Sequence, residues 1–457
     1  MADSLPALVI GAGVSGLACA CALRKSGVDA HVLEASPRAG GVIESVRRDG
    51  FLLELGPQSF SGTAPLLDLC RELGIESQLQ RAPERAPRFV LIDGALRPVP
   101  LSPPAFFSSS FVGAGTKLAI LRDLFGRTSP PVAEESIGAF VRRKFSPELL
   151  EKLIGPFVSG IYAGDPEKLS LSAAFPQLYE AEASAGSVLR GVMRASKRNK
   201  SAGQQRPLLL SFRDGNETLP RTIAQKLGSA LHLGARVSTV RCSSPASTFF
   251  VTASVDGSER VLTTQNLILA SPTDVAATLL VELSREFRTT LAEVEYAPVA
   301  VVSLGYRKSD VGRSLEGFGF LVPRSAGLQI LGSVWNSSLF PGRAPDGHAL
   351  LTSFVGGATN PPAARFSPAQ LTALVHRELS PILKITNPPV FSHVTVYERA
   401  IPQYNLGHAT RMKTLDTISA QCPGLFFAGN YLRGPAIGAC AEQAQEVAAQ
   451  VVRRLNP

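Results

Sequence analysis

The chain has 457 residues, and its 46 lysines and arginines outnumber 37 aspartates and glutamates, which gives a formal net charge of +9. Hydrophobic residues make up 45% and charged residues 18% of the sequence, so the composition excludes a disordered chain and allows two or three domains. No dense basic block with interleaved aromatic residues occurs, which argues against a nucleic-acid partner. The basic excess suits anionic small molecules or an anionic membrane surface.

Near the N-terminus, residues 5–23 form a run of 19 residues without a charge. We expect neither a signal peptide nor a transmembrane helix, because three glycines interrupt the run and no basic segment precedes it. A buried parallel strand followed by a packed helix has the same composition. The expected location is the cytoplasm, either free or peripheral on the inner face of the cell membrane.

The six cysteines form no CxxC pair and no zinc-ligand spacing with histidine. We therefore expect buried or neutral thiols in a reducing compartment, and no metal site.

The most informative segment is residues 11–16, which read GAGVSG. A strand-like run precedes this segment and a helical run follows it, as a dinucleotide fingerprint requires. Gly11 permits the tight turn, Gly13 permits the approach of a pyrophosphate, and Gly16 permits close packing of helix on strand. The helix N-terminus then offers free N–H groups to phosphate oxygens.

Glu34 ends the next strand-like run, 18 residues after Gly16. A carboxylate at this place accepts hydrogen bonds from both ribose hydroxyls and disfavours a 2′-phosphate, which argues against NADP. A glycine-rich turn without a nucleotide is the alternative interpretation.

Strand-like and helical runs along the chain predict an α/β plus α+β fold. We expect a Rossmann-like nucleotide domain built from the discontinuous segments 1–85, 207–275 and 391–457. A mixed-sheet substrate domain would comprise 86–97 and 276–390, and a helical subdomain would comprise 98–206.

The helical subdomain carries three phenylalanines followed by three basic residues: Phe106, Phe107, Phe111, Lys117, Arg122 and Arg127. Aromatic residues beside basic residues can form a membrane-facing surface, and an ordinary helical subdomain explains the same pattern. Residues 197–206 are polar and basic, and we expect them to form an exposed loop.

Both ends of the chain resemble the flavin-containing amine oxidase superfamily. Arg38, Gly40 and Gly41 extend the fingerprint as in its FAD enzymes, DGF and ELGP follow at residues 49–51 and 54–57, and AGN stands at residues 428–430. Interior segments are similar to the oxygen-dependent protoporphyrinogen oxidase family. These segments read GIYAGDP, GFGFLVP, SSLFPGRAP and IPQYNLGH at residues 160–166, 317–323, 337–345 and 401–408.

The resemblance implies FAD as cofactor, with contacts from residues near both ends of the chain. These residues are Gly11, Gly13, Ser15, Gly16, Glu34, Ala35, Arg38, Gly40, Gly41, Gly56, Pro57, Gln58, Ser59, Val237, Asn430, Pro435, Ala436 and Ile437. Three departures put local contacts in doubt: Pro435 lacks an N–H donor, Gln58 replaces a basic or amide residue of some relatives, and Asp214 replaces a glycine.

On the substrate side, the resemblance implies that Arg88 pairs with a porphyrin propionate. Phe318, Gly319, Leu321 and Phe354 match positions that line the macrocycle pocket. Gly160 matches the glycine whose backbone carbonyl assists removal of a proton, so Gly160 and Arg88 are the expected catalytic positions. His408 is either structural or in contact with the flavin or substrate.

The implied reaction is the oxidation of protoporphyrinogen IX by O2, with release of H2O2, in heme biosynthesis. Its product would pass to a ferrochelatase, and the chain would act as a monomer or a homodimer on a membrane surface or free of one. Coproporphyrinogen III is the alternative substrate. Two other readings are an amine or carotenoid oxidase, with Tyr404 and Trp335 as an aromatic pair, and a non-enzymatic flavoprotein that binds a tetrapyrrole or a partner.

Overall fold

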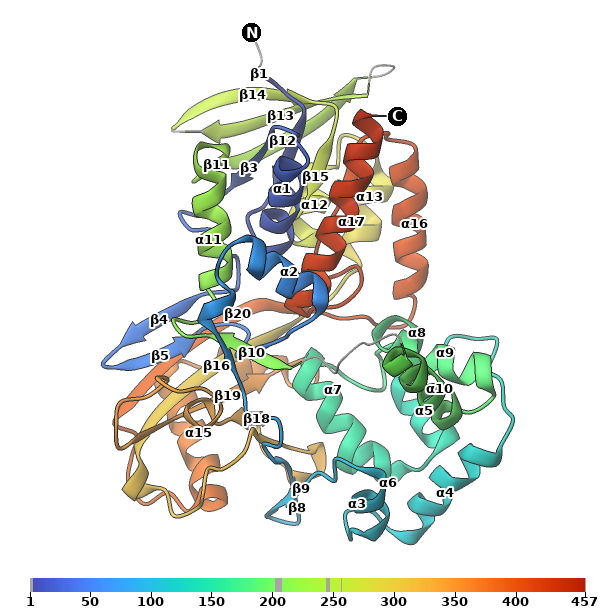
Figure 1. Ribbon diagram of the computed structural model, residues 1–457, viewed down its shortest axis with the longest axis vertical. Coiled ribbons are helices and arrows are strands. Elements are labelled where there is room, and N and C mark those ends of the chain that lie inside the picture. Colours follow the sequence, from blue (N-terminus) through green and yellow to red (C-terminus); the bar gives the residue numbers. More distant parts are fainter. Residues whose placement is uncertain (1–2, 202–207, 244–246, 256, 457) are drawn as a thin grey trace.

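The structure is a computed structural model that describes residues 3–201, 208–243, 247–255 and 257–456. Figure 1 shows an upper lobe around a parallel sheet and, below it, a mixed-sheet lobe beside a helical lobe. This arrangement confirms the expected fold class, a Rossmann-like domain of discontinuous segments with a mixed-sheet domain and a helical subdomain.

The parallel sheet of the upper lobe has five strands in the order β11-β3-β2-β15-β21. Its strands come from distant parts of the chain: β2 (Ala7–Ile10), β3 (Ala30–Glu34), β11 (Leu231–Leu233), β15 (Leu267–Leu269) and β21 (Leu425–Phe427). Every residue of β2 is buried, because both faces of the sheet are covered. The apolar run at the N-terminus is therefore a core strand and its helix.

Each face of this sheet has its own hydrophobic cluster. Val9 packs with the helices α1 (Val14–Lys25), α2 (Ala64–Glu72), α11 (Thr218–Leu227) and α17 (Ile437–Leu455). Leu8 packs on the other face, against a sheet of β1 (Asp3–Leu5), β12 (Arg236–Ser243), β13 (Thr248–Val255) and β14 (Ser258–Thr264), and against α12 (Thr273–Leu279), α13 (Arg285–Ala292) and α16 (His408–Ala420).

The mixed sheet has seven strands in the order β20-β16-β19-β18-β17-β8-β9, and only the pair β8–β17 is parallel. The strands are β8 (Arg88–Ile92), β9 (Ala95–Pro98), β16 (Tyr296–Arg307), β17 (Gly319–Leu321), β18 (Ile330–Val334), β19 (His348–Gly356) and β20 (Phe391–Pro402). Helix α15 (Pro368–Leu383) packs on one face through Leu371 and Leu379. The opposite face carries Val90, which packs with the helical lobe.

Strand β20 falls within 391–457, which the sequence assigned to the nucleotide domain. It pairs instead with β16 along its whole length, for example Tyr397 with Val299, so it belongs to the mixed sheet. The position of a segment along the chain does not name the sheet that it joins, which explains the error. The other domain boundaries stay predictions.

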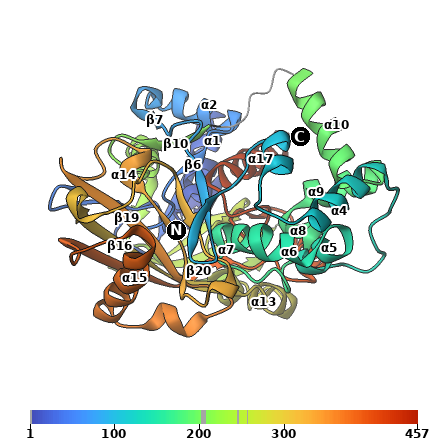
Figure 2. The same ribbon diagram turned by 90° about the horizontal axis from the view of Figure 1, so that it is seen from below.

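The helical lobe contains α3 (Pro103–Ser108), α4 (Ala114–Phe125), α5 (Ile137–Lys144), α6 (Pro147–Leu149), α7 (Gly155–Tyr162), α8 (Leu171–Ala174), α9 (Pro176–Ala185) and α10 (Val188–Ser201). A π-helical turn, Leu150–Ile154, joins α6 to α7. Seen from below in Figure 2, α7 lies between the mixed sheet and the rest of the helical lobe. This position brings α7 to the face of the sheet that α15 leaves free.

Two expectations about the helical lobe need correction. Helix α10 continues to Ser201, where a loop was expected, and 202–206 lie outside the described residues. Phe111 is buried and Phe106 and Phe107 are half-buried, so these rings do not form the exposed aromatic surface. Helix α4 instead carries three exposed apolar residues, Leu118, Leu121 and Phe125.

In the part of the chain that the structure describes, no helix is long and apolar enough to cross a bilayer, and no cluster of His, Cys, Asp and Glu could hold a metal ion. All six cysteines are free thiols. Burial raises the pKa of Cys19 to about 12, so this thiol is neutral. Cys242 is exposed, and partial burial of its thiol raises its pKa, so this thiol is neutral as expected.

A buried ionic network holds α4, α5 and α9 together. Lys144 Nζ lies 2.7 Å from Asp123 Oδ1 and 3.2 Å from Glu182 Oε1, and Arg143 also pairs with Glu182 at 2.8 Å. Both carboxylates are fully buried, so their charges depend on these partners.

We predict that Lys144→Met destabilises the protein by roughly 3–5 kcal/mol, because it leaves two buried carboxylates with too few cations. Urea unfolding followed by circular dichroism measures the change. Lys226→Met, at an exposed position of α11, is the matched control and should change the free energy of unfolding by less than about 0.5 kcal/mol. Equal effects of the two substitutions would contradict the prediction.

Candidate functional site

The glycine fingerprint forms a tight turn between β2 and α1. Gly11 has a φ of +104°, and a Cβ on Gly16 would lie 1.9 Å from the Gly11 carbonyl oxygen, so both positions require glycine. A Cβ on Gly13 would meet nothing within 4 Å, so this backbone faces open space. Gly40 N donates to Ala12 O at 2.8 Å and forms a β-bridge with the fingerprint at Gly13. The two glycine segments thus make one cradle.

Glu34 connects the end of β3 to this cradle. Its Oε2 accepts from the Ala12 N–H at 2.7 Å, and its Oε1 accepts from the Ser36 N–H and Oγ, both at 2.8 Å. A carboxylate has about four acceptor positions, so this half-buried group keeps capacity for ribose hydroxyls. Ala35, next to it, is exposed.

Val237 reaches the same end of β3 from another part of the chain. Ala235 N donates to the backbone oxygen of Glu34 at 2.7 Å, which brings the start of β12 beside the end of β3. The register of β12 with β13 shifts between Val237 and Thr239.

Arg38 shapes the loop that carries Gly40 and Gly41. Its guanidinium donates to the carbonyl oxygens of Gly41 at 2.5 Å and Ile43 at 2.9 Å, and it pairs with Glu44 at 3.1 Å. The structure therefore places Arg38 at the cradle, where its guanidinium also holds the loop of Gly40 and Gly41 in place.

The C-terminal segment meets the cradle through α17. Residues Pro435 and Ala436 precede α17, which begins at Ile437, so the missing N–H of Pro435 costs no helical hydrogen bond. The Cys440 thiol of α17 contacts the Ser15 hydroxyl of α1. Because α1 and α17 pack side by side, both helix N-termini point toward one region, as binding of an anionic group requires (Figure 1).

Asn430 is held by a buried aromatic pair. Tyr404 donates its hydroxyl to Asn430 O at 2.6 Å, and its ring stacks on His408 with centroids 4.3 Å apart. Burial lowers the pKa of His408 to about 4, so this ring is neutral near pH 7. Trp335 belongs to the separate core of the mixed sheet, so the structure does not join Tyr404 and Trp335 as a pair.

Residues 56–59 pack directly on the loop after Gly41. A Cβ on Gly56 would lie 2.0 Å from the Val42 carbonyl oxygen, and Pro57 and Ser59 are half-buried beside it. The Gln58 amide donates to Glu54 O at 3.0 Å and to Gly56 O at 2.9 Å, and its Oε1 accepts from Asn336 at 2.7 Å. These side-chain bonds shape the loop, and the flavin contact of Gln58 stays a prediction.

A buried ion pair lies behind this loop and joins the upper lobe to the mixed-sheet lobe. Arg343 Nη1 lies 2.5 Å from Glu54 Oε1, and both side chains are at most 2% exposed. Glu54 also accepts from Ser45 Oγ at 2.6 Å and from the Asn216 N–H at 3.0 Å. Burial raises the pKa of Glu54, and the Arg343 charge opposes that shift.

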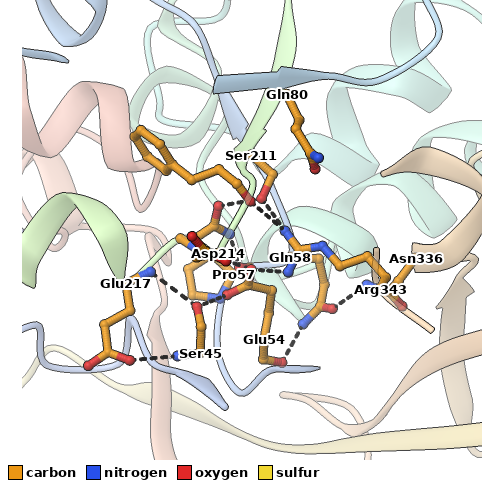
Figure 3. Close-up of polar contacts among 12 residues, drawn as sticks. Ser45, Glu54, Pro57, Gln58, Gln80, Ser211, Asp214, Glu217, Asn336 and Arg343 are labelled. Atoms are coloured by element: carbon orange, nitrogen blue, oxygen red, sulfur yellow. Dashed lines mark hydrogen bonds and ion pairs between the residues drawn. The ribbon is translucent and has the colours of Figure 1, made fainter. Parts of the chain in front are cut away.

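Figure 3 shows this network with Gln58 and Asn336 beside it. Arg343 reaches on to Ser211 of β10 (Leu209–Phe212), which pairs with β6 (Phe60–Ser61) and β7 (Leu79–Arg81). Asp214, the departure at a usual glycine, is exposed and pairs with Arg47 at 3.1 Å.

The free face of the mixed sheet carries a row of apolar positions beside a glycine. Leu321 of β17 pairs with Gly332 of β18, and Gly332 pairs with Phe354 of β19, so the three positions share one face. Leu321 and Phe354 are half-buried, and Leu321 Cδ2 lies within 3.3 Å of where a Cβ on Gly332 would be. Gly160 of α7 lies over Leu321, because a Cβ there would meet Leu321 Cδ2 at 2.7 Å.

Arg88 lies at the start of β8, beside Gly319 of β17. Its guanidinium lies 5.4 Å from the centroid of the Phe318 ring, and Phe318 N donates to Pro87 O at 2.8 Å. A Cβ on Gly319 would lie 2.0 Å from Ser333 O, so this position requires glycine. Among the described residues Arg88 has no carboxylate partner, so it can bind an external anion.

The sequence analysis missed Ser271, which follows β15 at the cradle. A Cβ on Gly11 would lie 3.2 Å from the Ser271 N, and the buried Ser271 hydroxyl has no hydrogen-bond partner among the described residues. The position of Ser271 in the sequence could have indicated it. Ligands bind at the carboxyl ends of parallel strands, and Ser271 follows β15, an inner strand of the parallel sheet. An orphaned hydroxyl and an open glycine both fit a dinucleotide.

Residues 14–452 match the family described as flavin containing amine oxidoreductase. The chain is 38% identical to the chloroplastic protoporphyrinogen oxidase of Nicotiana tabacum, across 100% of this chain and 87% of that protein. It is 29% identical to the coproporphyrinogen III oxidase of Bacillus subtilis, across 95% of each protein. A solved structure from Exiguobacterium sp. 255-15, assigned to the protoporphyrinogen oxidases, superposes with a TM-score of 0.81 at 25% identity over 99% of each chain. The chain therefore belongs to the flavin-containing amine oxidoreductases, in the branch of the protoporphyrinogen oxidases.

Proposed function

We propose that this chain oxidises protoporphyrinogen IX to protoporphyrin IX with bound FAD and O2, releasing H2O2. The observation that carries the proposal is the position of the Gly160 backbone over Leu321, on the sheet face that also carries Phe354. This face offers apolar side chains to a macrocycle, and Arg88 offers a charge to a propionate at its edge.

FAD fits the cradle better than a nicotinamide cofactor does. The open backbone at Gly13, the start of α17 and the orphaned Ser271 hydroxyl all face the region where a pyrophosphate and its ribitol chain would lie. A bound flavin supplies the hydride acceptor. The chain supplies the binding groups, of which Glu34 would hold the adenosine ribose.

The Gly160 carbonyl is a suitable acceptor for the substrate N–H proton. It lies in the last turn of α7, where carbonyl groups lack helical partners, and no backbone hydrogen bond of the described residues ends on its oxygen. The negative end of the α7 dipole stabilises the positive charge that develops on the substrate N–H group. Leu321 and Phe354 would exclude water from the Gly160 carbonyl while the proton leaves.

Coproporphyrinogen III is the second candidate, because one of the similar proteins is a coproporphyrinogen III oxidase. The two substrates carry the same macrocycle and differ in the number of propionates. An amine oxidase is disfavoured, because Tyr404 is buried with its hydroxyl bonded to Asn430 O.

We expect the purified holoenzyme to release FAD on denaturation, as identified by chromatography, and to produce a fluorescent porphyrin in air. Rates with protoporphyrinogen IX and coproporphyrinogen III should favour the former. A preference for coproporphyrinogen III would establish the alternative substrate, and H2O2 release with polyamines alone would contradict the proposal. Reduced flavin that air does not reoxidise would indicate a binding protein without oxidase activity.

For Arg88→Ala we predict retained FAD and a KM raised about 10-fold or more, since a charge-assisted bond contributes roughly 1.5–3 kcal/mol. Steady-state kinetics and the flavin absorbance check both parts. Arg260→Ala, on β14 of the upper lobe, is the control and should leave KM unchanged. An unchanged KM in Arg88→Ala would remove this residue from the substrate site.

We also propose peripheral contact with an anionic membrane through α4, which brings the site near a product acceptor such as a ferrochelatase. Leu118, Leu121 and Phe125 share one face of α4 and are exposed, Phe125 by 81%, with Arg122 beside them. Exposed apolar and basic residues together suit an anionic bilayer surface. Monomer and homodimer are both compatible with this surface.

We predict that Phe125→Ser lowers binding to vesicles that contain anionic phospholipid by about fivefold or more, because an exposed Phe contributes roughly 1.5–3 kcal/mol when buried. Co-sedimentation measures the bound fraction. Phe250→Ser, exposed on β13 at the other end of the molecule, should bind as the wild type does. Equal binding of the two variants would place the membrane contact elsewhere.

A further inference from the structure

The β8–β9 hairpin carries a second arginine on the substrate face. Arg97 of β9 lies directly opposite Val90 of β8, and directly opposed residues share a face of a sheet. Val90 in turn lies beside Leu321, the residue under Gly160. Arg97 therefore ends the row of positions that contains Leu321, Gly332 and Phe354.

The core clusters confirm which way this hairpin faces. Leu91 and Leu96, the neighbours of Val90 and Arg97, are buried in the cluster that contains the α15 residues. Val90 is buried in the cluster of the helical lobe. Since side chains alternate along a strand, Arg97 is on the face that carries Leu321 and Phe354, away from α15.

Both arginines of the hairpin are free to take an anion. Arg88 and Arg97 are exposed, and neither has an ion pair with a carboxylate in the described segments. Many other arginines of the chain do have such partners, among them Arg142 with Glu167 at 2.5 Å. Two unpaired positive charges on one face attract a ligand with two negative charges.

The spacing of the two arginines suits neighbouring carboxylates. Arg88 and Val90 are two residues apart on one strand, and Val90 and Arg97 are opposed across the hairpin. Strand geometry then places the two arginine Cα atoms roughly 8 Å apart. Long side chains from these positions can reach two propionates on adjacent pyrrole rings.

We propose that Arg97 is a second carboxylate-binding residue and that Arg88 and Arg97 together bind the two adjacent propionates of the porphyrinogen. The inference rests on the proposed function and adds a residue to the substrate site. Two attachment points fix the macrocycle in its plane, whereas one allows it to rotate about a single ion pair. The register of the ring over Gly160 then follows from both arginines.

The test compares the wild type with Arg97→Gln on two substrates, one with propionate carboxylates and one without. We expect Arg97→Gln to raise KM for protoporphyrinogen IX about fivefold, equal to roughly 1 kcal/mol and near the upper range for an exposed ion pair. With the dimethyl ester of protoporphyrinogen IX, which carries no carboxylate, wild type and Arg97→Gln should have equal KM values. Arg97→Lys should restore most of the affinity for the free acid.

Arg260→Gln serves as the control, because it removes an exposed arginine from the upper lobe. An unchanged KM for the free acid in Arg97→Gln, or equal effects on acid and ester, would overturn the proposal. Fluorescence titration with protoporphyrin IX provides a readout that needs no turnover, and weaker binding by Arg97→Gln is expected. A wild type that turns over no porphyrinogen would contradict the proposed function, while the titration would still decide on Arg97.

Discussion

The relation between the two sheet lobes depends on the buried ion pair of Glu54 and Arg343. Removing a carboxylate from water costs several kcal/mol, and only a well-placed cation with further donors offsets that cost. Here the donors come from Ser45 and Asn216 as well as Arg343, so three distant segments must assemble together. A misplaced lobe would leave a charge buried without its partner. The pair therefore specifies the arrangement more than it adds stability.

This constraint separates the groups that hold the site from those that bind ligands. Gln58 and Asn336 extend the buried network up to the cradle loop, and their hydrogen bonds stay within the protein. The residues on the ligand side, such as Glu34 and Arg88, are half-buried or exposed. The rigid interior thus positions polar groups such as Glu34 and Arg88, which can still form hydrogen bonds or ion pairs with ligands. Cofactor and substrate regions share one support at the boundary of the lobes.

Local patterns predicted the part of the site that is local in sequence. The fingerprint and Glu34 lie within 24 residues, and the turn at Gly11 and close packing at Gly16 follow from their chemistry. The pairing of β20 and the buried state of Phe111 depend on contacts between distant segments, which composition does not encode. The resemblance supplied Gly160 and Leu321, whereas only the packing of α7 on the sheet shows that they touch.

Gly332 has a consequence for how the preferences of this enzyme can change. A Cβ at this position would lie 2.6 Å from Phe320 O, so a larger residue here would push against the neighbouring strand. Hydrogen bonds between strands set that spacing, and no rotamer can adjust it. Mutation can therefore alter the neighbouring side chains, Phe354 and the arginines of the hairpin, but not the glycine itself. Selectivity in this lineage would diversify by the charge and shape of these side chains, around a backbone of constant dimensions.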